Sequence, residues 1–184
     1  MNSWHSRLNV LTWASDGNFF PIWFEDGNFF LSRLNWFKDS HFFGRIIEWK
    51  GYLDALQALA EVKRRGRSDW TYRLVGFGHK QRALDTAREL GIGDQVEVLD
   101  PVDDEGLKAQ LAWADLALMP SHFESFGLSI AEAQAAGLAV CAYAAGAVPE
   151  LVQHGTSGWL AEARGLIDSR PAEFATAFAM DCRG

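Results

Sequence analysis

The sequence predicts an α/β protein: a Rossmann-like parallel sheet of about six strands with helices on both faces, preceded by a short aromatic-rich β-meander. From residue 41 onward, short apolar runs alternate with segments whose apolar residues recur at helical spacing. Such short βα units are typical of a parallel sheet covered by helices on both sides. Residues 1–40 differ, because eight of the 13 Phe and four of the 8 Trp lie within the first 43 residues. We therefore divide the chain into an aromatic-rich N-terminal extension, 1–40, and a Rossmann-like domain, 41–184.

The N-terminal extension contains internal repeats, since Asp16-Gly17-Asn18-Phe19-Phe20 recurs as Asp26-Gly27-Asn28-Phe29-Phe30. An Asp-Gly pair between aromatic, β-prone runs favours a hairpin turn. The pattern predicts a small antiparallel meander with strands near 8–14, 18–24 and 28–36. Its exposed aromatic residues need a covering partner, so the extension is interpreted either as a docking surface or as an irregular leader.

In the domain that follows, six apolar runs predict strands near 41–47, 71–76, 95–99, 115–119, 138–143 and 157–161. The segments between and after them predict helices near 51–65, 79–90, 104–113, 127–136, 147–153 and 171–180. In the first helix, Leu53, Leu56 and Ala60 share one face, as expected of an amphipathic helix. Gly91 follows the second helix, at a position where glycine commonly ends a helix. Ligands of such sheets bind beyond the carboxyl ends of the strands, so functional residues are expected there.

The composition excludes several classes of function. The net charge of −7 argues against a nucleic-acid groove, since phosphate backbones demand clustered Lys and Arg. No run approaches the ~20 apolar residues of a membrane-spanning helix, and no basic-then-apolar leader marks secretion. Cys141 and Cys182 form neither a disulfide framework nor a metal cluster, and Cys141 lies in an apolar run typical of a core. Without a D-x-D motif or zinc-ligand histidine spacing, we expect no metal, no cofactor and a cytoplasmic protein.

One stretch at a strand end carries the clearest functional pattern. An apolar run stops at Pro120, a short loop carries Glu124, and Gly127 opens a helical run that contains Glu132. Free backbone N–H groups and the helix dipole at such a start favour an anion such as phosphate. Carboxylates repel phosphate, so the two glutamates are expected to meet neutral hydroxyl groups of the same ligand. An anion flanked by hydroxyls describes a nucleotide sugar, whereas the alternative is a surface loop before an ordinary amphipathic helix.

Two cations, Arg45 and Lys50, follow the first predicted strand in Gly44-Arg45-Ile46-Ile47-Glu48-Trp49-Lys50-Gly51. Fixed cations at this point stabilise the negative charge that builds on a departing diphosphate. Arg offers a bidentate fork and Lys a point charge, although surface cations near a turn are the alternative interpretation. After the second strand, Val75-Gly76-Phe77-Gly78 indicates a tight turn and not a dinucleotide fingerprint, because Gln81 stands where the third glycine is needed.

These motifs resemble, in the same order, those of retaining glycosyltransferases with two Rossmann-like domains, the GT-B architecture of the glycogen-synthase-like and mannosyltransferase-like group. Residues 124–132 match the E-x7-E signature. Residues 44–51 match G-R-x-x-x-x-K-G, and 75–78 match V-G-x-G. The resemblance, which runs from about 41 to 161, implies catalytic roles for Arg45, Lys50 and Glu124. It implies a donor site made of Arg45, Lys50, Gly76, Glu124, Phe126, Gly127, Leu128 and Glu132.

The resemblance also assigns roles within that site and exposes two departures. The Arg and Lys hold the donor phosphates, Glu124 takes the transferred sugar and Glu132 the ribose hydroxyls. Ala139 replaces a usual proline, which we expect to be harmless. Ala147 replaces the second glycine of a loop that approaches the donor sugar, so its methyl is expected to narrow the pocket or alter backbone angles. His122 either touches the donor or is a solvated loop histidine.

Family members place an acceptor-binding domain before this one, and residues 1–40 do not read as βα units. We therefore predict a retaining, metal-independent glycosyltransferase that uses a nucleotide-diphosphate sugar, or its donor-binding half. A partner subunit would then supply the acceptor side, unless the chain is a truncated fragment. The alternatives are a non-catalytic nucleotide-sugar-binding or partner-docking module and a sugar-nucleotide epimerase. No nucleic-acid partner is expected, and membrane contact would be peripheral.

Overall fold

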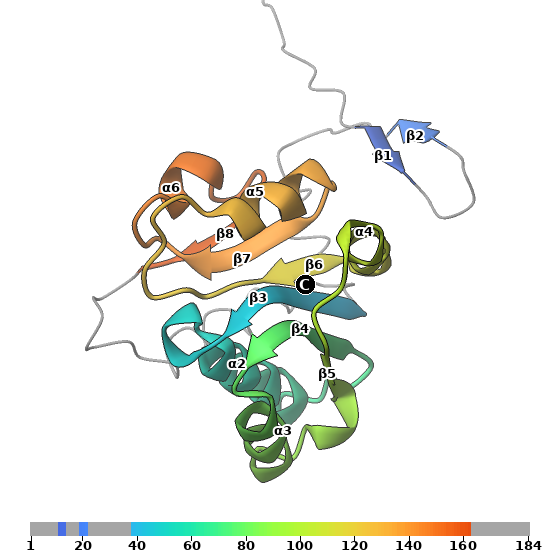
Figure 1. Cartoon of the computed structure of the whole chain (residues 1–184), viewed down its shortest axis with the longest axis vertical. Coiled ribbons are helices and arrows are strands. Elements are labelled where there is room, and N and C mark those ends of the chain that lie inside the picture. Colours follow the sequence, from blue (N-terminus) through green and yellow to red (C-terminus); the bar gives the residue numbers. More distant parts are fainter. Residues whose placement is uncertain (1–10, 14–18, 22–37, 163–184) are drawn as a thin grey trace, which may run out of the picture.

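A six-stranded parallel sheet dominates the computed structural model, which describes residues 11–13, 19–21 and 38–162 (Figure 1). The strand order is β5-β4-β3-β6-β7-β8, and each neighbouring pair runs parallel. This order puts β3 and β6 side by side at the point where the winding reverses, which is where open α/β sheets bind their ligands. The predicted fold class, a Rossmann-like parallel sheet with helices on both faces, is confirmed.

Each strand forms at one of the predicted apolar runs. The central strands are buried on both faces, so they read as continuous apolar runs and not as alternating patterns. The strands are β3 (Asp39–Ile46), β4 (Thr71–Gly78), β5 (Val96–Leu99), β6 (Leu116–Leu118), β7 (Ala139–Tyr143) and β8 (Gly158–Ala161).

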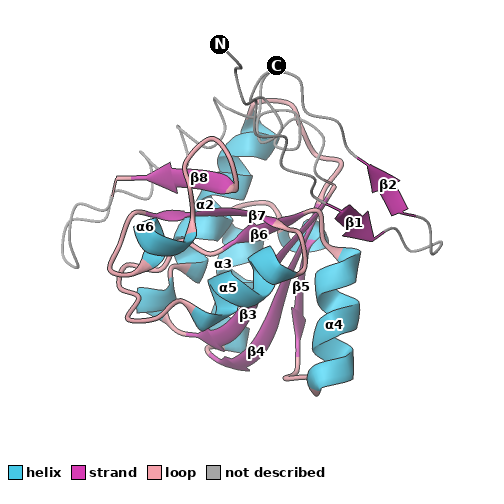
Figure 2. Ribbon diagram, turned by 90° about the horizontal axis from the view of Figure 1, so that it is seen from above, coloured by secondary structure: helices cyan, strands magenta, loops and turns pink. Residues whose placement is uncertain are grey.

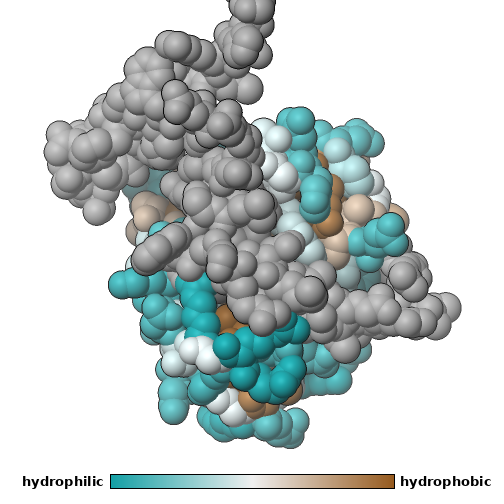
Figure 3. Space-filling view, turned by 180° about the vertical axis from the view of Figure 1, so that it is seen from behind, coloured by the Kyte–Doolittle hydropathy of each residue, from teal (hydrophilic) through white to brown (hydrophobic). Residues whose placement is uncertain are grey.

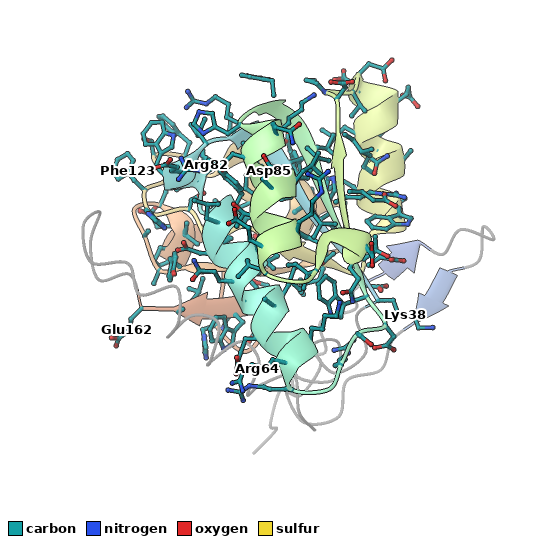
Figure 4. All side chains as sticks on the ribbon, turned by 90° about the horizontal axis from the view of Figure 1, so that it is seen from below. Lys38, Arg64, Arg82, Asp85, Phe123 and Glu162 are labelled. Atoms are coloured by element: carbon teal, nitrogen blue, oxygen red, sulfur yellow. The ribbon has the colours of Figure 1, made fainter. Side chains whose placement is uncertain are left out.

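Helices cover the two faces of the sheet separately. Figure 4 shows α2 and α3 side by side on one face, while α4, α5 and α6 lie on the other (Figure 2). Their bounds are α2 (Tyr52–Arg64), α3 (Lys80–Glu89), α4 (Asp104–Trp113), α5 (Leu128–Ala135) and α6 (Val148–Leu151), with 3-10 turns η1 (Glu48–Lys50) and η2 (Gly93–Gln95). The last described helix is shorter than the predicted 147–153, because Val152 already has an extended backbone. None of the described helices is both long and apolar enough to span a bilayer.

The core lies between the sheet and these helices. Leu56 and Leu59 of α2 are completely buried, whereas Leu53 and Ala60 are only partly buried, so the buried face is rotated slightly from the predicted one. Fully burying one such side chain stabilises the fold by about 1.5–3 kcal/mol. Cys141 is buried in β7, as predicted. Gly91 ends α3 with a φ of 72° and donates its N–H to Arg88, which confirms the predicted helix stop.

The described part of the N-terminal extension is an antiparallel pair, β1 (Leu11–Trp13) and β2 (Phe19–Pro21). These strands fall within the first two segments of the predicted meander. The third predicted strand, 28–36, and the predicted helix 171–180 lie outside the described residues. The division into an extension, 1–40, and a domain, 41–184, stays a prediction.

His41 is a buried titratable group in β3. Its ring stacks on Phe43 with centroids 5.4 Å apart, and neither ring nitrogen has a hydrogen-bond partner among the described residues. Burial, with a smaller contribution from the nearby Arg73 cation, lowers the pKa of His41 to about 4. The side chain is therefore neutral at pH 7, which suits a site inside the core.

Protonation of His41 should make the free energy of unfolding depend on pH. Its pKa is lower in the folded chain than the ordinary 6.5, so the unfolded state binds the proton more readily. Stability should therefore be full above about pH 6.5 and fall by up to about 3 kcal/mol as the pH drops towards 4. His41→Leu should flatten this slope in urea titrations at several pH values, whereas the exposed His79→Gln should not. A wild-type slope equal to that of His41→Leu would contradict the prediction.

Candidate functional site

A cleft of about 290 Å³ opens where β3 and β6 end. Its walls come from two parts of the sequence: the end of β3 with Lys50 of the loop after it, and the loop after β6, which continues directly into the start of α5. The parallel sheet brings them to one edge, because the carboxyl ends of parallel strands meet there. The lining residues are Phe42, Phe43, Gly44, Arg45, Lys50, Met119, Ser121 and 124–130.

Most of the predicted site residues meet in this cleft. Six of them line it, and these are Arg45, Lys50, Glu124, Phe126, Gly127 and Leu128. Two of them do not line it. Glu132 is exposed on the second turn of α5, so contact with the ribose stays a prediction. Gly76 is buried in β4, where a Cβ would lie 1.8 Å from the carbonyl oxygen of Gly44. Its contribution is the close approach of β4 to β3 behind the cleft.

An ion pair occupies the cleft. Lys50 Nζ donates to Glu124 Oε2 at 2.6 Å, and the two side chains are only 22% and 15% exposed. Ionic pairs that are this sheltered are screened less by salt than surface pairs are. The predicted phosphate-binding cation and the predicted sugar-binding carboxylate are therefore in direct contact.

Arg45 is the second cation of the cleft, and its environment is different. Its guanidinium lies over the ring of Trp49, 5.3 Å from the ring centroid, and the residue is exposed. A cation held over an aromatic face keeps its charge and its hydrogen-bond donors available. Within the described residues, Arg45 forms no ion pair. The cleft thus presents one neutralised cation and one open cation.

Backbone contacts fix the loop after β3 against the loop after β6. Gly51 has a φ of 76°, and a Cβ there would lie 1.7 Å from the carbonyl oxygen of Pro120. Two residues after Pro120, the backbone N–H of His122 donates to the carbonyl of Trp49 at 2.8 Å. Lys50 and Glu124 are therefore attached to backbones that cannot separate without breaking these contacts.

The turn between β7 and α6 is hydrogen-bonded to the backbone of Glu124. The N–H of Ala147 donates to the carbonyl of Glu124 at 2.8 Å. Ala147 has a φ of −75°, an ordinary right-handed value, and does not line the cleft. The expectation that its methyl narrows the pocket or alters the backbone angles is therefore wrong for the described cleft.

The start of α5 presents backbone donors to the cleft. Gly127 precedes the helix with a φ of 70°, and its carbonyl accepts the first helical hydrogen bond, from Ala131. The N–H groups of the first turn have no helical acceptor, as in any α-helix. Leu128, Ser129 and Ile130 of that turn line the cleft, so an anion there would meet both cations and the helix dipole.

A model of the family glycosyl transferases group 1 matches residues 38–180. The chain belongs to this family. The D-inositol 3-phosphate glycosyltransferase of Corynebacterium kroppenstedtii is 35% identical over 147 residues, which cover 76% of this chain and 31% of that protein. The 2-deoxystreptamine glucosyltransferase of Streptomyces kanamyceticus is 36% identical over 119 residues, which cover 64% and 30%. The chain therefore spans about a third of the length of these curated relatives.

Solved structures of similar proteins agree with the family assignment. HepE of Anabaena, in complex with UDP and glucose, superimposes with a TM-score of 0.63 at 29% identity, over 83% of this chain and 40% of HepE. The C-terminal domain of LpcC, a group 1 family protein of Francisella tularensis, gives 0.62 at 26% identity, over 78% and 74%. Both matches place the described sheet among glycosyltransferase domains.

This family member also contains a buried hydrogen-bond network that the sequence did not reveal. Asp54 of α2 is 4% exposed and accepts from His122 Nε2 at 2.7 Å and from the Tyr143 hydroxyl at 2.8 Å. Burial and the Asp54 carboxylate raise the pKa of Tyr143, so the hydroxyl stays protonated and donates. His122 is therefore not a solvated loop residue, since its side chain is 14% exposed and bonded to Asp54. It does not line the cleft, and contact with the sugar nucleotide stays a prediction.

The outer rim of the cleft is apolar. Phe123, Phe126 and Leu128 are exposed, and Phe123 points outward from its loop (Figure 4). Elsewhere, where described residues are visible from behind, the surface is mostly hydrophilic with small hydrophobic patches (Figure 3). In the described part of the chain, no group of three or more His, Cys, Asp or Glu side chains is arranged to hold a metal ion.

The Asp54 network should stabilise the fold measurably. Tyr143→Phe removes one donor from a buried carboxylate, and a hydrogen bond to a charged group contributes about 1.5–3 kcal/mol. We expect a loss of that size in the free energy of unfolding, measured by urea denaturation. Tyr72→Phe, whose hydroxyl donates to the carbonyl of Leu118, is a matched control with a neutral acceptor and should lose less. Additive losses for Tyr143→Phe and Asp54→Asn in the double variant would rule out a coupled network.

Proposed function

We propose that this chain is the donor-binding part of a retaining, metal-independent glycosyltransferase that transfers a sugar from a nucleotide-diphosphate sugar to an acceptor. One observation carries the proposal: Arg45, Lys50 and Glu124 converge with the free N–H groups of α5 on a single cleft. The arrangement suits a ligand that combines a diphosphate with a hydroxyl-rich sugar. The matched relatives, named as glycosyltransferases, support it.

The residues would divide the work by charge. Arg45 and Lys50 would hold the diphosphate together with the backbone around Gly127 and Leu128. As the glycosyl–phosphate bond breaks, negative charge grows on the leaving group, and fixed cations lower the barrier without a metal ion. Glu124 would take hydroxyls of the transferred sugar, and Glu132 those of the ribose. Retention follows from the resemblance of residues 124–132 to the E-x7-E signature.

UDP is the first nucleotide to test. HepE, at 29% identity, is described in complexes with UDP and with UDP-glucose. The described cleft would form only the donor half of the active site, so the acceptor side would lie outside it. We propose that a partner subunit or a further segment of a longer protein supplies it, and that the protein acts in the cytoplasm.

Removing either cation should weaken UDP binding. Arg45→Ala should raise the dissociation constant about tenfold, a typical loss for a charged hydrogen bond. Lys50→Ala should cost more, up to about a hundredfold, because it also leaves Glu124 unpaired beside the phosphates. Isothermal titration calorimetry with UDP and GDP measures both effects.

Two variants serve as matched controls. Arg88→Ala and Lys108→Ala remove cations that pair with carboxylates on the exposed faces of α3 and α4, away from the cleft. Both should bind UDP like the wild type, with unchanged thermal melting. Equal affinity of Arg45→Ala, Lys50→Ala and these controls would refute the assignment. Transfer or hydrolysis of UDP-glucose by the chain, with or without an acceptor partner, would separate an enzyme from a binding module.

A further inference from the structure

We propose that Glu124 makes this cleft discriminate against the free nucleoside diphosphate and in favour of the intact nucleotide sugar, by acting as the internal counter-ion of Lys50. The inference rests on the proposed function and adds a specificity role to one of its residues. It follows from a contact that the sequence motifs alone do not predict, the 2.6 Å ion pair between these side chains in the cleft.

The pair is positioned so that a diphosphate must compete with it. Lys50 and Glu124 both line the cleft, and each is more than three-quarters buried. A phosphate that reaches Lys50 must displace the carboxylate or share the ammonium with it. Like charges held close together in a partly buried site repel strongly, so a carboxylate left beside the phosphate opposes binding.

The backbone of Glu124 is held in place, so the carboxylate cannot move far from Lys50. The carbonyl of Glu124 is held by the N–H of Ala147 at 2.8 Å, and the His122 N–H bond to Trp49 fixes the loop just before it. On the other side, Gly51 packs directly on Pro120, which limits movement of Lys50. Once a phosphate has replaced Glu124 as the partner of Lys50, the Glu124 carboxylate therefore stays close to the phosphate and needs a new hydrogen-bond partner.

The two ligands differ in what they offer to the displaced carboxylate. A nucleotide sugar carries hydroxyl donors next to its second phosphate, and a carboxylate accepts such hydrogen bonds well. A free nucleoside diphosphate lacks those donors and carries an additional negative charge on its terminal phosphate. The substrate thus replaces the lost ion pair of Glu124, whereas the product leaves the carboxylate unpaired and repelled.

Arg45 makes this discrimination compatible with capture of the ligand. Its guanidinium lies over the Trp49 ring, with no carboxylate in ion-pair contact in the described part of the chain. It can therefore attract any diphosphate at the outset. Lys50 joins only when Glu124 is released, so the second cation is engaged most favourably by a ligand that also satisfies the carboxylate.

Calorimetric titrations of the wild type and Glu124→Gln with UDP and UDP-glucose test the inference. Glu124→Gln keeps the size of the side chain and removes its charge. It should bind UDP about three- to tenfold more tightly than the wild type and bind UDP-glucose no more tightly, so the preference for the sugar nucleotide falls. Glu124→Asp keeps the negative charge and should therefore not tighten UDP binding.

Controls separate this from a general effect of charge or folding. Glu150→Gln removes an exposed carboxylate from α6 and should leave both affinities unchanged. Thermal melting of each variant checks that it is folded, and UDP binding by Glu124→Gln is itself proof of an intact cleft. UDP binding detected in Glu124→Gln but too weak to measure in the wild type would support the inference.

The failures are distinguishable. If UDP binds the wild type, depends on Arg45, and binds Glu124→Gln equally or less tightly, only this inference falls. If UDP, GDP and pyrophosphate bind neither the wild type nor Glu124→Gln, the proposed function falls and the inference with it.

Discussion

The contact between Gly51 and the carbonyl of Pro120 is the constraint on which the cleft depends. It leaves no room for a side chain, so the loop after β3 and the loop after β6 touch through their backbones. Lys50 lies one residue before this contact and Glu124 four residues after it. Their 2.6 Å approach is therefore a consequence of the backbone contact between the loops that follow two adjacent parallel strands, and not of a long flexible reach.

Much of the fold follows from local features of the sequence. Strands β6 and β7 are uninterrupted apolar runs, because their central places in the sheet bury both faces, and the run that contains β6 is stopped by Pro120. Gly91 ends α3 because its backbone is left-handed, a conformation that glycine adopts without steric cost, and this is why the glycine predicted the end of the helix. The bounds of α6 were predicted least accurately, because no glycine or proline marks its end and the chain becomes extended at Val152.

The sequence predicted those site residues that belong to motifs at the carboxyl ends of strands, and not the others. Lys50 and Glu124 follow strands that the topology makes neighbours, and Arg45, predicted to lie just past the first strand, is the penultimate residue of β3, so spacing along the chain was enough to bring them together. The Asp54 network was not predictable, because His122 and Tyr143 lie 68 and 89 residues away from Asp54 and no local pattern links them. The same holds for Gly76, whose contact with Gly44 exists only across the sheet.

The carboxylates of Asp54 and Glu124 lie near the same pair of loops but differ in burial and in their partners, and this difference explains their different roles. Asp54 is almost completely buried and receives two hydrogen bonds from His122 and Tyr143, neither of which lines the cleft. Removing its partners would leave a buried charge unsatisfied, which is strongly unfavourable. Glu124 is also paired, but its partner faces the cleft and can be taken by an anion from solution. One carboxylate thus holds the loops in place, while the other is free to exchange its partner, and the first makes the second effective by keeping its backbone still.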